Sequence, residues 1–86
     1  MGIAKVRFEV RDRVLYVFDL LRTNPQGLTV QDIINEIYAD FGVKVNRKSI
    51  YKDLDAIGLY MPIISERRRD KKIYWRTMRK GDQENE

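Results

Sequence analysis

The sequence predicts a small, mainly α-helical domain that carries one β-hairpin. Apolar residues recur at helical spacing in three consecutive segments, at residues 13–23, 30–41 and 47–57. Two short runs of β-branched and aromatic residues then flank a charged stretch, which is typical of a hairpin. The 86 residues suffice for one domain with one modest core.

The first predicted helix covers residues 13–23. Asp12 is a suitable N-cap, and Pro25 and Gly27 end the helical pattern. The apolar stripe consists of Val14, Val17, Phe18 and Leu21, whereas Leu15, Tyr16 and Leu20 lie outside it. Residues 4–10 alternate strictly between apolar and polar, which predicts a short strand unless the helix begins earlier and includes Val10.

The second predicted helix covers residues 30–41. Thr29 is a good N-cap, and Asp32 completes a capping box in which aspartate replaces the usual glutamate. One uninterrupted apolar face, which we expect to be buried, is formed by Val30, Ile33, Ile34, Ile37, Tyr38 and Phe41. Gly42 is positioned to end the helix in the left-handed conformation.

The third predicted helix covers residues 47–57, between a cap at Asn46 and Gly58. Ile50, Leu54 and Ile57 form its apolar stripe, and the opposite side carries Arg47, Lys48, Tyr51, Lys52 and Asp55. A hairpin follows, with strands at residues 63–65 and 73–75 and no glycine to define the turn. We expect a domain at residues 1–78 and a flexible charged tail at residues 79–86.

The order of the elements is that of a winged helix-turn-helix, a three-helix core with a hairpin as its wing. Only a few residues join the second and third helices, as a helix-turn-helix requires. In this arrangement the third helix enters the major groove of DNA.

Positive charge is concentrated in the C-terminal half of the chain. Residues 43–80 carry 12 basic and 4 acidic side chains, whereas residues 1–42 carry 5 basic and 6 acidic ones. The net charge of the whole chain is +4. A positive field confined to one half favours a polyanion as partner, with a solvated basic face as the alternative.

The candidate DNA contacts lie on the third helix and at the hairpin tip. On the helix, the groups able to reach base edges and phosphates are Arg47, Lys48, Ser49, Tyr51 and Lys52. The tip holds five cations in six positions, namely Arg67, Arg68, Arg69, Lys71 and Lys72. They can bind the flanking phosphate backbone or enter the minor groove. The alternative to DNA contact is a solvated face for the third helix and a mobile charged loop for the hairpin tip.

The composition argues against an enzyme. Cysteine and histidine are both absent, which excludes thiol catalysis and the commonest proton shuttle and metal ligand. The chain has no phosphate-cradling glycine loop and no paired carboxylates in an apolar setting. We expect no enzymatic activity and no cofactor. The sequence shows no signal peptide and no membrane span, so we expect a cytoplasmic, nucleoid-associated location.

Two segments, LTVQDI at residues 28–33 and VNRKSIYKDLDAI at residues 45–57, resemble the DNA-binding domain of DeoR-type bacterial regulators. Within that group they are similar to the N-terminal domain of WYL-domain regulators, over residues 13–75. The resemblance implies DNA contact by the third-helix residues Arg47, Lys48, Ser49, Tyr51 and Lys52. It implies a structural role for Asp53 beside the buried stripe.

The chain departs from the family pattern at four points. Ser49 stands where threonine is usual, and Lys52 replaces an arginine and so loses bidentate geometry. The family's hairpin commonly holds a glycine, and this one does not. No ligand-sensing WYL domain follows, so we expect either an excised domain or a standalone regulator.

The expected function is therefore sequence-specific binding of double-stranded DNA by a transcriptional regulator. One alternative is a winged helix that binds protein, which would predict an uncharged or acidic third helix, and another is a binder of structured RNA. We also expect a homodimer through Leu15, Tyr16 and Leu20 of the first helix together with residues 4–10. Alternatively, the domain's own N-terminal arm covers these residues, or they are scattered exposed apolar groups. In either case the protein would be a monomer.

Overall fold

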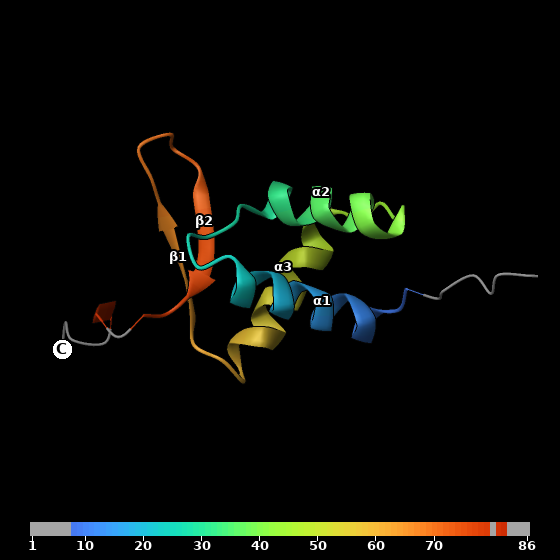
Figure 1. Cartoon of the computed structure of the whole chain (residues 1–86), viewed down its shortest axis with the longest axis horizontal. Coiled ribbons are helices and arrows are strands. Elements are labelled where there is room, and N and C mark those ends of the chain that lie inside the picture. The colour runs from blue at the N-terminus through green and yellow to red at the C-terminus, as the bar shows by residue number, and fades with distance from the viewer. Residues whose placement is uncertain (1–7, 80, 83–86) are drawn as a thin grey trace, which may run out of the picture.

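Three α-helices followed by a two-stranded antiparallel hairpin make up the structure, a computed structural model that describes residues 8–79, 81 and 82 (Figure 1). The helices are α1 (Val10–Thr23), α2 (Val30–Phe41) and α3 (Arg47–Gly58), and the strands are β1 (Ile63–Arg67) and β2 (Ile73–Thr77). The expected mainly α-helical domain with a small hairpin is confirmed. None of the helices in the described residues is long and apolar enough to cross a membrane.

The start of α1 differs from the expectation. The helix begins at Val10 with Glu9 as its N-cap, so the predicted cap at Asp12 is wrong. Asp12 lies in the first turn instead, where its Oδ2 accepts the Glu9 N–H at 3.1 Å and its charge meets the positive end of the helix dipole. The predicted strand is also wrong for Phe8, Glu9 and Val10, and residues 4–7 lie outside the described residues.

Both ends of α2 are capped as expected. The Thr29 side chain accepts the Asp32 N–H at 2.9 Å, and the Asp32 carboxylate accepts the Thr29 N–H at 3.0 Å. Gly42 follows the helix with φ at 68°, and its N–H donates to the Tyr38 carbonyl at 2.8 Å. The left-handed conformation explains why glycine stands here.

The apolar face of α2 is buried only in part, which corrects the expectation of a fully buried face. Val30, Ile33 and Ile37 belong to the core, but Tyr38 and Phe41 are 53% and 40% exposed. Phe41 packs in an aromatic cluster at the edge of the core, with ring centroids 4.4 Å from Phe8 and 5.0 Å from Tyr16. The last turn of α2 therefore reaches past the end of the three-helix core.

The core lies between the three helices, with the hairpin covering one end (Figure 1). Its nine buried apolar side chains are Val17, Leu20, Leu21, Val30, Ile33, Ile37, Ile50, Leu54 and Ile57. The expectation that Leu20 lies outside the core is wrong, because α1 contacts β2 as well as α3 and so buries a wider stripe.

Tyr16, also expected at a dimer surface, is used within the domain. Its O–H donates to the Asp40 carboxylate, and burial together with this bond raises the pKa of Tyr16. Of the three α1 residues expected at a dimer surface, Leu15 alone is exposed, at 60%.

The hairpin strands are longer than predicted, and each contains five residues. Ile63 pairs with Thr77 at one end and Arg67 with Ile73 at the other. The turn contains Lys71 with φ at 69°, in the position that glycine usually takes in a three-residue hairpin loop. The Lys71 N–H donates to the Arg68 carbonyl at 2.8 Å and closes the turn.

The hairpin is joined to the helices through β2. The Leu28 and Trp75 backbones exchange two hydrogen bonds, of 2.9 and 2.7 Å, so the segment before α2 is fixed beside β2. Trp75 also packs against the core.

The segment after β2 contacts the rest of the domain at two of its described residues. Asp82 forms an ion pair with Arg76 at 2.8 Å and accepts the Arg79 N–H at 2.6 Å. Arg79 also donates to the Pro25 carbonyl at 3.1 Å. Arg79 and Asp82 are thus both bonded to the folded domain.

Candidate nucleic-acid interface

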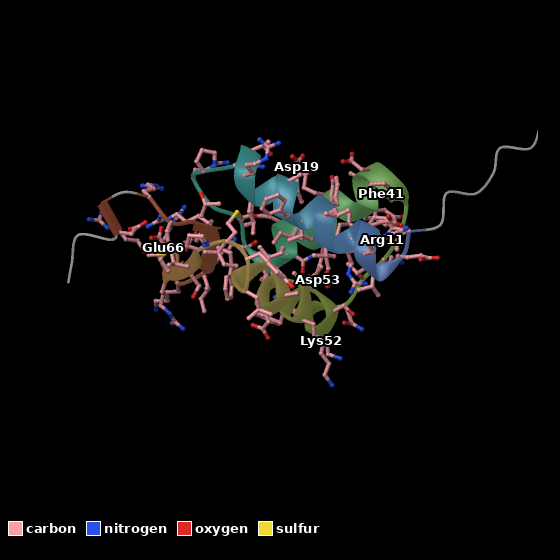
Figure 2. All side chains as sticks on the ribbon, turned by 90° about the horizontal axis from the view of Figure 1, so that it is seen from below. Arg11, Asp19, Phe41, Lys52, Asp53 and Glu66 are labelled. Carbon is pink, nitrogen blue, oxygen red and sulfur yellow. The ribbon has the colours of Figure 1, made fainter. Side chains whose placement is uncertain are left out.

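The two sides of α3 have opposite character. Ile50, Asp53, Leu54 and Ile57 form its buried side, and Arg47, Lys48, Tyr51 and Lys52 are exposed on the other. Figure 2 shows the contrast at two successive residues, because Lys52 points away from the domain and Asp53 points toward α1. The spacing of apolar residues in α3 correctly predicted which side is exposed.

A buried ion pair fixes α3 against α1. Asp53, with a side-chain exposure of 2%, accepts hydrogen bonds from Arg13 Nε at 2.5 Å and Nη2 at 3.0 Å. The bond to Asp53 raises the pKa of Arg13, which keeps its charge at any working pH. Asp53 thus has the structural role that the family resemblance implied.

The first turn of α3 is held from two directions. Asn46 Oδ1 accepts the Ser49 N–H at 2.8 Å, which caps the helix as expected and leaves the Ser49 side chain half-buried. Arg47 Nη2 donates to Gln31 Oε1 on α2 at 3.2 Å, and Gln31 Nε2 donates to Asn35 Oδ1 at 2.9 Å. The Arg47 guanidinium is therefore oriented by α2 while it remains exposed.

The hairpin supports Tyr51 from the other side. The Tyr51 ring meets the Trp75 ring at a centroid distance of 6.4 Å and an interplanar angle of 66°, an edge-to-face contact. Tyr51 remains 45% exposed, so its hydroxyl can reach a ligand while its ring rests on β2.

The hairpin cations do not form one cluster, because Arg67 lies in β1 whereas the others lie in the turn that follows it. Successive side chains of a strand point to opposite faces. Arg67 pairs with Ile73, and both lie on the hairpin face that carries Trp75 and contacts α3. Glu66 and Tyr74 lie on the other face. The exposed cations at the tip are Arg67, Arg69, Lys71 and Lys72.

Arg68 is turned back onto the domain, which corrects its placement among the free cations. Its Nε donates to Glu66 Oε2 at 2.9 Å, its Nη2 donates to the Gln26 carbonyl, and its guanidinium lies 4.0 Å above the Tyr74 ring. These contacts engage two of the three guanidinium nitrogens and hold the side chain against the domain. Gly27 has φ at 100°, a conformation that residues with a side chain rarely adopt, which explains why glycine stands beside Arg68.

A polar network covers the face of the hairpin opposite α3. Arg76, which is 5% exposed, forms ion pairs with Glu66 at 3.2 Å and with Asp82 at 2.8 Å. Hydrogen bonds from Arg68 and Arg76 lower the pKa of Glu66, and those from Arg76 and the Arg79 N–H lower the pKa of Asp82. The network fixes the hairpin and stays apart from the exposed side of α3.

A groove of about 550 Å³ brings α3 and the hairpin tip together. Its lining comes from three elements, namely the start of α2 (Thr29, Val30, Gln31, Asp32 and Asn35), the start of α3 (Arg47 and Tyr51) and the tip (Lys71, Lys72 and Ile73). Three cations and several amide and hydroxyl groups therefore converge where α2, α3 and the hairpin meet. Such a groove suits an anionic, hydrogen-bonding ligand.

Eight of the ten predicted site residues are exposed, namely Arg47, Lys48, Tyr51, Lys52, Arg67, Arg69, Lys71 and Lys72. Among the described residues, six of their side chains (Lys48, Lys52, Arg67, Arg69, Lys71 and Lys72) form no ion pair and no side-chain hydrogen bond. These charges are therefore available to an external partner.

Two supporting residues, Gln31 and Trp75, were not predicted from the sequence. Gln31 could have been found as the polar member of an exposed i, i+4 pair with Asn35 at the start of α2. No local signal shows that Trp75 supports Tyr51, because the contact joins residues from separate elements.

A comparison with protein-family models finds no match for the chain, and comparisons with curated proteins and with solved structures find no significant match.

Proposed function

We propose that the chain is a winged helix-turn-helix domain that binds double-stranded DNA sequence-specifically, as a transcriptional regulator acting at the nucleoid in the cytoplasm. The observation that carries the proposal is the shared groove, which joins the exposed basic side of α3 to the basic hairpin tip. The resemblance to DeoR-type regulators points in the same direction.

The dimensions of α3 suit the major groove. Twelve residues at a rise of about 1.5 Å give a helix of about 18 Å, and the major groove of B-DNA is about 12 Å wide. The exposed side of α3 would face the bases, while the Arg13–Asp53 pair keeps the buried side against α1. The hairpin is then the wing and lies along the flanking backbone.

The contacts divide into two kinds. Arg47 and Lys52 have the donors that read guanine in the major groove, and Gln31 orients the Arg47 guanidinium. Lys48, Ser49 and Tyr51 fit phosphate oxygens. The tip cations Arg67, Arg69, Lys71 and Lys72 would bind phosphates on either side of the site without reading sequence.

Selection from random DNA duplexes, with random structured RNA and single-stranded DNA as competitors, tests the proposal. A double-stranded consensus should emerge that outcompetes both competitors. Enrichment of RNA would favour an RNA-binding domain. Failure to enrich any nucleic acid at low salt would contradict the use of this surface and favour a protein partner.

Variants separate the two kinds of contact. Lys52→Ala should cost about 1–3 kcal/mol on the consensus site and relax the base preference at one position. Arg69→Ala should weaken all duplexes about equally and reduce the salt slope by about 1. Arg22→Ala is the matched control, because Arg22 pairs with Asp19, which lies on the opposite side of the domain from Lys52 (Figure 2). Equal losses for all three variants would show that only overall charge matters.

A further inference from the structure

A second groove, away from the basic surface, lies between α1 and the end of α3. Its volume is about 260 Å³ and its lining is apolar throughout, formed by Val14, Leu15, Phe18, Ala56, Ile57 and Tyr60. Leu15 and Tyr60 stand on its rim and are 60% and 89% exposed. Large apolar side chains that line an open groove are typical of an interaction surface.

The exposed face of α1 beside this groove carries opposite charges on either side of Leu15. Arg11, Leu15 and Asp19 are spaced four residues apart, so they follow one another along one face of the helix. The side-chain exposures of Arg11 and Asp19 are 80% and 56%. Figure 2 shows these two residues toward opposite ends of α1.

This pattern is complementary to itself in one particular arrangement. If two copies of α1 pack antiparallel about a two-fold axis at Leu15, each residue before Leu15 faces the equally distant residue after it on the other copy. Arg11 then faces Asp19 of the other copy twice, each about 6 Å along the helix from the axis. A parallel arrangement would instead place like charges together.

We propose that this face of α1 and the apolar groove beside it form a homodimer interface, with a second copy of this chain as the occupant. The two Leu15 side chains meet at the axis and cover the rims of both grooves. Within one copy, Arg11 Nε lies 3.9 Å from Asp12 Oδ1 and Asp19 pairs with Arg22, both at exposed positions. In the dimer, Arg11 pairs instead with Asp19 of the second copy. The proposal does not depend on DNA binding, since neither charge lies on α3 or the hairpin.

The expected dimer is weak. α1 contains 14 residues and is about 21 Å long, so one helix pair with its grooves is smaller than a standard interface of about 1,600 Å². We therefore expect dissociation constants in the micromolar range, and sedimentation should be followed from about 1 to 300 µM in the absence of DNA.

A charge exchange between two variants tests the arrangement. Arg11→Glu alone and Asp19→Lys alone each place like charges opposite one another twice, and each should weaken self-association about tenfold or more. An equimolar mixture of the two variants should associate at least as tightly as the wild type, because both contacts of the mixed dimer join opposite charges. The double variant Arg11→Glu, Asp19→Lys should also dimerise.

Two further variants address the apolar part. Leu15→Glu should abolish the dimer, whereas Tyr38→Glu, which places the same charge at an exposed aromatic residue of α2, should leave it unchanged. Circular dichroism checks that each variant is folded. A mass of one chain at every concentration, or a mixture that associates no better than either charge variant alone, would overturn the proposal. Because no DNA is present, neither result would affect the proposed DNA binding.

Discussion

Replacing Arg13 with methionine is expected to destabilise the domain strongly, because it leaves the Asp53 carboxylate buried without its partner. This carboxylate is 2% exposed and accepts hydrogen bonds of 2.5 and 3.0 Å from Arg13. Removing one partner of a buried ion pair costs about 3–5 kcal/mol. Coulomb's law gives about 4 kcal/mol for charge centres about 4 Å apart at an effective dielectric constant of about 20.

A loss of this size is a large part of the total. For 86 residues the free energy of unfolding is about 4–13 kcal/mol, so the variant should unfold at least about 12 °C below the wild type. Urea denaturation followed by circular dichroism measures the free energy of unfolding directly. Methionine retains the length of the arginine stem, so lost packing contributes little.

Two control variants define what would refute this reasoning. Arg22→Met removes an exposed ion pair of α1 and should cost less than about 1 kcal/mol. The double variant Arg13→Met, Asp53→Leu removes both buried charges and should recover most of the lost stability. If Arg13→Met costs less than about 1 kcal/mol, or the double variant is as unstable as the single one, the pair does not hold α3 against α1 as inferred.

Three more predictions concern the hairpin and the proposed interface. Lys71→Gly should raise the free energy of unfolding, measured in urea, by about 1 kcal/mol, because Lys71 has a left-handed φ of 69°. Lys71→Ala should give no gain, and equal effects of the two variants would exclude backbone strain as the cause. The pKa values of Glu66 and Asp82 are lowered in the folded state. Their ion pairs with Arg76 therefore stabilise the fold fully above the ordinary carboxyl pKa of about 4, and this stabilisation is lost as the pH falls from there through the folded-state pKa. Asp82→Asn should therefore lose less stability than the wild type between pH 5 and pH 2, measured by Trp75 fluorescence, and equal losses would contradict the role of Asp82. DNA affinity should fall with salt at a log–log slope of about −4 to −5, from about four to six phosphate contacts, and a slope shallower than about −2 would count against the basic surface.

The elements whose signals are local could be predicted from the amino-acid sequence alone. The caps at Thr29, Asn46 and Gly42 were predicted correctly, because each cap bonds to a backbone group within a few residues. The exposed side of α3 was predicted for a similar reason, since helical periodicity alone assigns Ile50 and Lys52 to opposite sides. The start of α1 was not predicted, because alternating residues at 4–10 and a helical stripe through Val10 compete in the same segment.

Contacts between residues far apart in the chain could not be predicted, and they determine which charged and apolar groups remain exposed. Arg68 looked like a free cation, but it binds the Gln26 carbonyl, which lies 42 positions away in the sequence. Tyr16 looked like part of an exposed surface until the end of α2 supplied Asp40 as its hydrogen-bond partner. Composition and periodicity predict which side chains a segment presents. Whether a group remains available to a ligand depends on which other segment packs against it, and that follows from contacts across the fold.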